Sequence, residues 1–486
     1  MRPERRLGAA ACYLAPSAVA LALPLATLPV MTRWLGPDDY GMIAVAQVVA
    51  SLFTGLASLG VNTGLERNYF KYEKDHAALA RLFHTAHALV LGGIALLGAL
   101  LALLGGPVSS LLFGRDDHAG FLFAMAIPAA LGVLFTMQLT VFRNQGRARA
   151  FMTSSIAAGL LEAGSTIVLV TTTAAGVWSV PLGALVGKVI VVGAGWLTLR
   201  RVLRPGLDRR LAGEMLEIGL PLMPRAFVGV ADNGVDRLAL NWMVSLGQAG
   251  FFGLANRLGA SVFSVMTSIE QLFIPQVYRL MFQGDEPATR IGRYLTPYFY
   301  ISTLVAAAAI LFVEEALWVL VAPAFWPLRF AAAVLAAYYG QLFFGKIIGA
   351  QWTFLKKTWY ATPASVARLT LHLALTLALV GPMGALGAAL ALWIAATFVD
   401  GVCLAVAHRL YPIRYELRFV VPVMALLYAA AVWVVLPAFV PVPYLAHLAV
   451  RLALFAAFLA AGARWLLPLG GQVTTLLRGQ GAAARA

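Results

Sequence analysis

One apolar segment, roughly residues 250–278, carries a stripe of polar side chains. Its members are Arg257, Ser261, Ser264, Ser268 and Gln271. They follow one another at i, i+4, i+7, i+11 and i+14, which keeps them on one face of an α-helix. A guanidinium, hydroxyls and an amide on a single face could bind a polar ligand. The alternative is structural, because serines in apolar helices often donate to the carbonyl one turn earlier.

Four more apolar segments show a polar face of the same kind. The segment at 41–63 has Gln47, Ser51, Thr54, Ser58 and Asn62, and the segment at 213–243 has Arg225, Asp232 and Asp236. The segment at 150–173 has Ser155, Glu162, Thr166 and Thr173, and the segment at 358–380 has Thr362, Ser365, Arg368, His372 and Thr376. The simplest arrangement points these faces at one shared aqueous cavity.

Charges inside apolar segments are expensive. If those segments cross a membrane, each charge costs at least about 2.5 kcal/mol unless it faces protein or water. Arg225 with Asp232 could be a structural ion pair. Asp232 and Asp236 lie one helical turn apart, so both ionised would repel, and this pair, with Glu162, is a candidate for ion coupling. Lys188 and Arg451 are expected to extend toward the membrane surface.

The elements that must position these residues are membrane-spanning helices. The chain has 486 residues, of which 61% are hydrophobic and only 12% charged, against about a quarter charged in soluble domains. Its apolar runs are continuous and about 20 residues long, which indicates helices. We expect fourteen spans, at 9–32, 41–63, 82–104, 118–142, 150–173, 176–199, 213–243, 250–278, 294–320, 328–350, 358–380, 384–407, 418–438 and 443–466.

Basic residues give the orientation. They cluster at the chain ends and in every second gap between spans, whereas the alternate gaps hold only Arg33, Arg115 and Arg329. By the positive-inside rule both termini are cytoplasmic. The net charge of +15 is therefore mainly a topology signal, and we expect no nucleic-acid partner.

The motif search excludes several classes of protein. No phosphate-binding loop, H-E-x-x-H, paired C-x-x-C or G-x-S-x-G motif occurs, so we expect no enzyme, no cofactor and no metal site. Gly183-x-x-x-Gly187 inside a span indicates close helix packing. Cys12 and Cys403 lie in apolar runs, and no disulfide is expected.

An internal repeat relates two turns of the chain. Residues 34–41 (Trp-Leu-Gly-Pro-Asp-Asp-Tyr-Gly) are echoed by 242–251, and six spans separate the copies. An even number of spans makes the repeats parallel, with a site expected between the halves. We expect domains at 1–212 and 213–410, each a six-helix bundle, and two extra helices with a short cytoplasmic tail at 411–486.

These segments resemble the polysaccharide flippases of Wzx type, within the MOP exporter superfamily. The resemblance rests on residues 35–41 (LGPDDYG), 58–70 (SLGVNTGLERNYF), 219–224 (GLPLMP), 236–238 (DRL) and 250–255 (GFFGLA). It covers most of the chain, although its motifs are loose. It implies an all-α fold of two six-helix bundles in a V, followed by two further helices.

The same resemblance implies a substrate and a location. Such proteins move an undecaprenyl-diphosphate-linked oligosaccharide across the bacterial inner membrane by alternating access. Arg257 and Arg225, with Arg67 at the cytoplasmic mouth, would bind the diphosphate, since arginine can grip phosphate with two hydrogen bonds. The sugar would contact Gln47, Asn62, Ser261, Ser264, Ser268 and Gln271. Further expected partners are membrane lipids, a polysaccharide polymerase and a chain-length regulator.

Prolines and glycines near the first turn are candidates for a gate or hinge. They are Pro16, Pro24, Pro29, Gly36 and Gly41. Proline removes a backbone donor and kinks a helix, so the first span could move as a lateral gate, or the kink could be fixed.

Two other classes of function remain open. The first is a drug or organic-cation antiporter of the same superfamily, which an arginine-lined cavity disfavours. The second is a membrane polymerase or ligase, which would normally carry a large outer loop.

Overall fold

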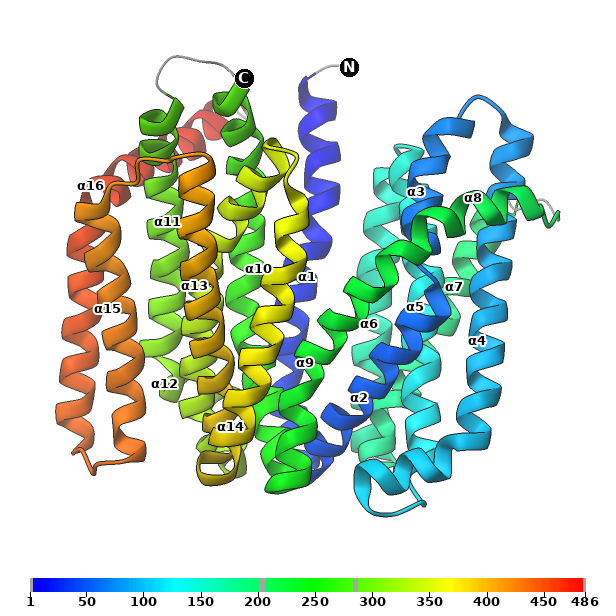
Figure 1. Cartoon of the computed structure of the whole chain (residues 1–486), viewed down its shortest axis with the longest axis horizontal. Helices are drawn as coiled ribbons and strands as arrows, with labels where there is room; N and C mark the ends of the chain where they lie inside the picture. The colour runs from blue at the N-terminus through cyan, green and yellow to red at the C-terminus, as the bar shows by residue number, and fades with distance from the viewer. Residues whose placement is uncertain (1–2, 201–205, 283–286, 484–486) are drawn as a thin grey trace. The chain divides into compact units, whose positions relative to one another are not determined.

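The protein is almost entirely helical in the computed structural model, which describes residues 3–200, 206–282 and 287–483 (Figure 1). The α-helices are α1 (Pro3–Trp34), α2 (Pro37–Ser58), α3 (Val61–Tyr72), α4 (His76–Phe113), α5 (Ala119–Asn144), α6 (Ala148–Thr172), α7 (Ser179–Leu199), α8 (Arg209–Gly219), α9 (Met223–Met243), α10 (Leu246–Phe282), α11 (Pro287–Leu311), α12 (Val313–Leu320), α13 (Arg329–Phe354), α14 (Ala361–Leu410), α15 (Leu417–Val435) and α16 (Tyr444–Ala483). Short 3-10 helices are η1 (Gly176–Trp178), η2 (Leu220–Leu222), η3 (Pro323–Leu328), η4 (Thr358–Tyr360) and η5 (Leu436–Ala438). The expected all-α class is confirmed, with no strand in the described part of the chain.

Ten helical segments of the described chain are long and apolar enough to cross a membrane, so the protein is a multi-pass membrane protein. The expected count of fourteen is not confirmed. One of the ten, Thr358–Leu410, covers two expected spans, because α14 joins two limbs across Gly384, where φ is 55° and ψ is −136°. Another expected span, 213–243, forms α9 but carries four charged residues there.

The described contacts define two compact units. Unit 1 comprises Met1–Gly253 and Trp318–Trp326, and unit 2 comprises Leu254–Leu317 and Pro327–Ala486. The expected division at 1–212, 213–410 and 411–486 stays a prediction.

Unit 1 is built around an apolar core to which α2–α8 all contribute. Leu65, Leu82, Leu134 and Met215 are all inaccessible there. The chain breaks between α2 and α3 at Leu59 and Gly60, both with positive φ (46° and 67°). A Cβ on Gly60 would lie 2.6 Å from the backbone of Gly219, where α8 ends. Glycine is therefore required at this break both for its φ and for the close approach of two backbones.

The predicted repeat shows itself as a reciprocal contact inside unit 1. A Cβ on Gly41 would collide with the carbonyl of Leu246, and one on Gly250 would collide with the carbonyl of Pro37. Gly250 follows Gly41 by the same number of residues as Leu246 follows Pro37, so the N-terminal turns of α2 and α10 make the same contact in both directions. Gly36 differs, because its φ is −82° and a Cβ there would meet only the Asp39 carboxylate, at 3.8 Å.

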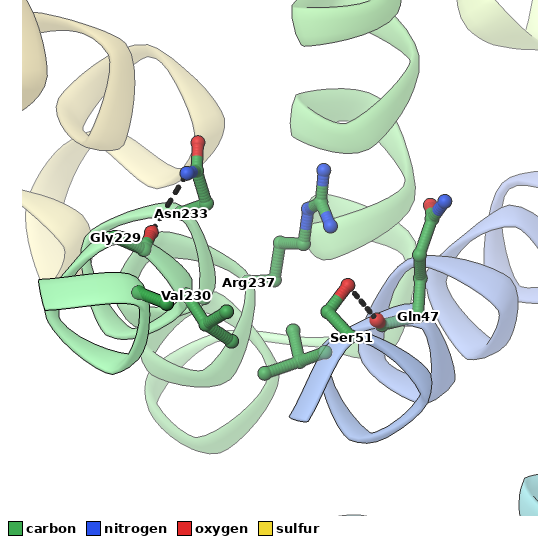
Figure 2. A pocket seen from close by; sticks show the side chains of 9 residues that line it. Gln47, Ser51, Gly229, Val230, Asn233 and Arg237 are labelled. Atoms are coloured by element: carbon green, nitrogen blue, oxygen red, sulfur yellow. Dashed lines mark hydrogen bonds between the residues drawn. The ribbon is translucent and has the colours of Figure 1, made fainter. Parts of the chain in front are cut away.

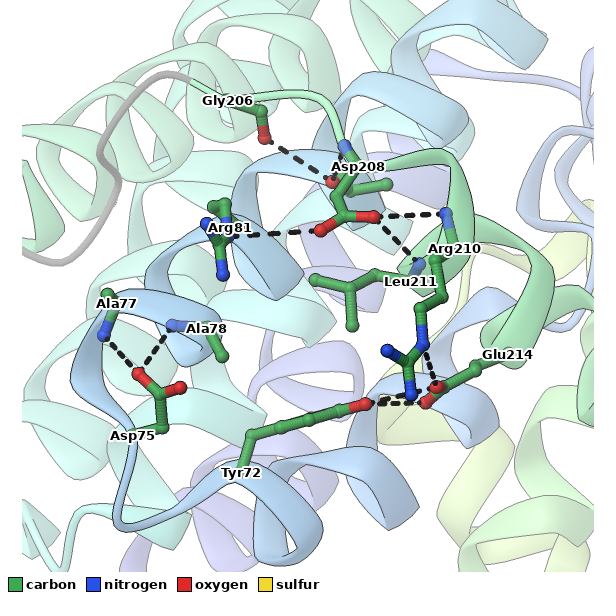
Figure 3. A network of polar contacts seen from close by, with 11 residues as sticks. Tyr72, Asp75, Ala77, Ala78, Arg81, Gly206, Asp208, Arg210, Leu211 and Glu214 are labelled. Atoms are coloured by element: carbon green, nitrogen blue, oxygen red, sulfur yellow. Dashed lines mark hydrogen bonds and ion pairs between the residues drawn. The ribbon is translucent and has the colours of Figure 1, made fainter.

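Helix α8 is fastened to α3 and α4 by polar contacts in unit 1 (Figure 3). Glu214 accepts from Lys71 Nζ at 2.8 Å and from the Tyr72 hydroxyl at 2.9 Å. Asp208 caps α8 by accepting from the backbone N–H of Arg210 and Leu211. The hydrogen bond from Lys71 lowers the pKa of the Glu214 carboxyl.

In unit 2, α15 and α16 pack against α11, and Arg451 of α16 is fully buried. Its Nη2 lies 2.8 Å from Glu315 and 3.3 Å from Glu314, and its Nη1 donates to the carbonyl of Leu311 at 3.0 Å. The expectation that Arg451 extends to the membrane surface is therefore wrong. A buried guanidinium needs paired carboxylates, and here they anchor the last helix to α11 and α12.

Candidate functional site

A polar cavity of about 320 Å³ lies between α2 and α9 in unit 1 (Figure 2). Its lining residues are Gln47, Val48, Ser51, Ala226, Gly229, Val230, Asn233, Gly234 and Arg237. Gly234 brings the helices together, since a Cβ there would lie 2.8 Å from the Val48 side chain. Small residues on α9 therefore leave the room that the polar groups surround.

Arg237 gives this cavity its positive charge. In Figure 2 its guanidinium reaches between Asn233 of α9 and Gln47 of α2. The Nε atom is buried and donates to no acceptor, although the side chain as a whole does have a partner. Asn233 donates its Nδ2 to the carbonyl of Gly229 at 2.8 Å, which leaves its amide oxygen for a ligand.

Gln47 and Ser51 of the predicted α2 stripe line this cavity, whereas Asn233 and Arg237 were not among the predicted site residues. Gln47 is exposed, and Ser51 donates to its backbone carbonyl at 2.8 Å. Arg237 could have been recognised, because a cation at membrane depth marks a functional site by default. Asn62, further along the predicted stripe, is half-buried with Oδ1 enclosed and unbonded.

The hydroxyls of the α10 stripe are bonded within their own helix, as the structural alternative expected. Ser261 donates to the carbonyl of Leu258 at 2.6 Å, Ser264 to Ala260 at 3.0 Å, and Ser268 to Ser264 at 2.9 Å. Ser264 and Ser268 are nevertheless exposed. Their oxygens keep lone pairs, so they can accept hydrogen bonds from a ligand but can donate only by giving up the carbonyl.

Two of the three arginines predicted to bind the diphosphate have described side chains, and both are exposed. Arg257 is exposed on α10 and makes no ion pair with any residue that the structure describes. Arg67 is also exposed, and its Nη1 lies 3.5 Å from the Asn68 side-chain oxygen. The side chains of Arg225 and Gln271 lie outside the described part of the chain. Whether the α2 and α10 stripes share one cavity stays a prediction.

A second set of polar contacts in unit 2 fixes the rotation of α10 against α13. Asn256 accepts from the Tyr339 hydroxyl at 2.8 Å, and Glu270 pairs with Lys346 at 2.8 Å. Between them the Lys346 ammonium lies 5.2 Å from the ring centre of Phe263. Asn256, Phe263 and Glu270 recur every seven residues, so they share one face of α10. This seam leaves Arg257, Ser264 and Ser268 on the neighbouring, exposed face.

The candidates for ion coupling are not free groups. Glu162 of α6 pairs with Lys188 of α7 at 3.0 Å. Asp232 and Asp236 are buried, and neither is without a partner. Helices α6 and α7 pack closely, since a Cβ on Gly187 would lie 2.8 Å from the Glu162 backbone nitrogen, which confirms the packing predicted for Gly183-x-x-x-Gly187. On α14, His372 and Thr376 are fully buried and do not open to a cavity.

The proline candidates in α1 lie within continuous helix. Pro16, Pro24 and Pro29 all fall inside α1, and their role in gating stays a prediction. Across the described residues, no group of three or more His, Cys, Asp or Glu side chains is placed to hold a metal ion.

Residues 30–325 match the model of a family described as polysaccharide biosynthesis protein. The chain belongs to this family. It is also 26% identical over 192 residues to the lipid III flippases of Escherichia coli (strain K12) and Shigella flexneri. That match spans 38% of this chain and 46% of each flippase, so the chain matches less than half the length of these curated relatives.

Solved structures of members of the MOP superfamily share the fold. The lipid II flippase MurJ, in an inward closed conformation, aligns with a TM-score of 0.67 at 14% identity, over 95% of this chain and 100% of MurJ. A multidrug resistance MATE family transporter in an inward-facing conformation aligns with a TM-score of 0.59 at 16% identity, over 83% of this chain and 98% of the transporter. At these identities the likeness establishes the fold and leaves the substrate open.

Proposed function

We propose that this protein is a flippase that moves an undecaprenyl-diphosphate-linked oligosaccharide from the cytoplasmic to the outer leaflet of the bacterial inner membrane. Membership in a polysaccharide biosynthesis family and similarity to lipid III flippases support this class of substrate. The observation that carries the proposal is the cavity in unit 1, where the Arg237 guanidinium lies among amide and hydroxyl groups.

The chemistry of the cavity fits a head group that is both anionic and rich in hydroxyls. Arg237 would bind the diphosphate through charge-assisted hydrogen bonds. Gln47 and Asn233 would accept and donate to sugar hydroxyls. Arg257, exposed in unit 2, and Arg225 and Arg67 would give further contacts to phosphate as the head group moves, while the isoprenoid tail stays in lipid.

The expected orientation completes the proposal. Basic residues in alternate gaps favour cytoplasmic termini, so the sugar would enter on the side where it is assembled. A polysaccharide polymerase and a chain-length regulator would act on the flipped product, and membrane lipids would surround the protein throughout.

Deletion of the gene in its host tests the function. Lipid-linked glycan should accumulate and stay inaccessible to a membrane-impermeant sugar oxidant added outside intact spheroplasts. Expression of the wild-type chain should restore access. Unchanged outer-leaflet glycan in the deletion strain would rule the proposal out.

A drug or organic-cation antiporter is the second candidate, because the fold is shared with multidrug transporters. One of these, DinF-BH, was solved in complex with R6G. The guanidinium in the cavity opposes a cationic cargo by repulsion. Ethidium efflux by proteoliposomes that fail to flip lipid-linked glycan would favour this alternative.

A further inference from the structure

One acidic residue at membrane depth differs from the others in its hydrogen bonding. Five described carboxylates within or at the ends of spans have partners on other helices or are otherwise engaged. Glu162 pairs with Lys188, Glu270 with Lys346 and Glu315 with Arg451. Asp232 and Asp236 each interact with another group. Asp400 of α14 makes no hydrogen bond or ion pair with any residue in the described ranges, and its Oδ2 is buried.

Asp400 lies in a helical segment that is long and apolar enough to cross a membrane. It is ten residues from the end of α14 at Leu410, which is roughly 15 Å of helix. An ionised carboxylate at such depth is expensive without a partner. Arg368, on the first limb of α14, is the charged group that acts on it, but no ion pair within 4 Å joins them.

A second buried atom without a partner belongs to Gln341, which bonds to the residue one helical turn before Asp400. Gln341 of α13 is 5% exposed, and its Oε1 accepts from Trp393 at 3.1 Å, Thr397 at 2.9 Å and Tyr428 at 2.9 Å. The N–H of Trp393 and the hydroxyl of Tyr428 fix the orientation of this amide, because a flipped amide would point its own N–H groups at them. The single proton of Thr397 is shared with the Trp393 carbonyl, which lies 2.7 Å away. The Nε2 of Gln341 is then buried without a partner.

Thr397 and Tyr428, which both bond to the Gln341 amide oxygen, place Gln341 in the neighbourhood of Asp400. Thr397 precedes Asp400 by one helical turn, and the Tyr428 hydroxyl is within the electrostatic reach of Asp400. The ionisable groups that interact electrostatically with Asp400 in the described ranges are Arg368 on the first limb of α14, Cys403 on its own limb and Tyr428 on α15.

We propose that Asp400 is a proton-binding site of the transport cycle. The carboxylate takes up one proton from water and becomes a neutral acid, which removes its buried charge and supplies the donor that Oδ2 lacks. Loss of that proton restores the ion and strengthens its attraction to Arg368. The cluster of Asp400, Gln341 and Tyr428 therefore has two charge states, and this part of the proposal does not depend on which substrate is carried.

The link to transport rests on the flippase function proposed above. Asp232, Asp236 and Glu162 are engaged with other groups, so exchange of a proton at those positions would first have to break a contact. Asp400 can exchange a proton without losing a hydrogen bond. The proton that couples to glycan movement is therefore assigned to Asp400.

Infrared titration of the full chain in lipid nanodiscs tests proton binding directly. At neutral pH, surface carboxyl groups are ionised, so a protonated-carboxyl stretch reports a buried acid. The wild type should show this band, and it should disappear on alkalinisation and in Asp400→Asn. Glu270→Gln and Glu162→Gln are matched controls and should keep it. Persistence of the band in Asp400→Asn, or its absence from the wild type across the titration, would overturn the proposal.

Transport supplies the second readout. Proteoliposomes would carry fluorescent undecaprenyl-diphosphate-linked N-acetylglucosamine, with and without an imposed pH gradient. The gradient should change the wild-type transport rate severalfold and the Asp400→Asn rate by less than twofold. In Asp400→Glu, which keeps a carboxyl group, the gradient should again change the transport rate. An unaltered response in folded Asp400→Asn overturns the assignment. If the wild type moves no lipid, the flippase function fails instead, and the infrared result still decides proton binding.

Discussion

At the scale of single residues, ligand binding in the cavity depends on which polar atoms already have hydrogen-bond partners within the protein. The hydroxyls of Ser264 and Ser268 on α10 donate hydrogen bonds to backbone carbonyls, so they are weak candidates for substrate specificity. Arg237 has a buried Nε with no acceptor and lines the cavity itself. Guanidinium geometry, and not the number of hydroxyls, should therefore set affinity for the head group.

This argument predicts the effect of two substitutions at Arg237. Arg237→Gln removes the charge and should lower the flipping rate at least about tenfold, which corresponds to about 1.4 kcal/mol. Arg237→Lys keeps the charge but cannot form the two-pronged contact, so its loss should be smaller. Flipping of the fluorescent lipid measures both.

The control is Arg115→Gln, because Arg115 is exposed outside the cavity and pairs with Asp117. Its rate should match the wild type. Equal losses at positions 115 and 237 would show that overall charge, not the cavity, governs transport.

A contrasting prediction concerns Ser264. Ser264→Ala removes an exposed hydroxyl whose proton is bonded within the helix, so the flipping rate should change by less than about twofold, within the small effects typical of such surface changes. A loss as large as that of Arg237→Gln would show that the serine oxygen contacts the substrate.

At the scale of elements, the close contact of α2 with α10 requires glycine. Gly41→Ala would place a methyl group on the Leu246 carbonyl, and such overpacking typically costs about 1–3 kcal/mol. Gly55→Ala is the matched control on the same helix, since nothing lies within 4 Å of its Cβ. Thermal unfolding in detergent should show a lower Tm for Gly41→Ala alone, and equal Tm values would contradict the contact.

The attachment of α8 should depend on pH. The pKa of Glu214 is lowered in the folded protein, first by its hydrogen bond from Lys71. Its stabilising contribution is therefore complete above the unfolded pKa of about 4.3 and is lost as pH falls through the lower folded pKa. Glu214→Gln should lower Tm slightly at neutral pH and reduce the further loss on acidification, because exposed pairs contribute little. An identical acid dependence in both proteins would exclude this role.

Sequence patterns predicted the helices and their polar faces better than they predicted which helices and side chains contact one another. Two residues of the α2 stripe, Gln47 and Ser51, line a cavity, and the contact of this stripe with sugar stays a prediction. Periodicity reports which side chains share a face, not which helix that face meets. The pairs Lys188–Glu162 and Arg451–Glu315 join helices whose contact no single segment encodes. Arg451 was therefore expected at the membrane surface. The boundary expected between the spans 358–380 and 384–407, by contrast, coincides with the non-helical residue Gly384 inside α14.

At the scale of the whole molecule, the membrane potential should act on the cargo. Moving one negative charge outward through an inside-negative potential is favoured by about 2.3 kcal/mol per 100 mV, equivalent to about fiftyfold in an equilibrium ratio. A diphosphate carries at least one such charge across. This field on the cargo and a proton exchanged at Asp400 are two driving forces that can be tested apart.

Two gradients, applied separately, should distinguish these forces in proteoliposomes that contain the fluorescent lipid. A potassium gradient with valinomycin, negative on the side from which the lipid leaves, should shift its distribution toward the opposite leaflet in both the wild type and Asp400→Asn, because the charge of the cargo is the same. A pH gradient without a potential should act on the wild type only. If the potential has no effect on either protein, the head group crosses with its charge neutralised by co-transported cations, and protonation at Asp400 would then be one step of that neutralisation. If both proteins respond equally to the pH gradient, proton exchange takes place elsewhere in the chain.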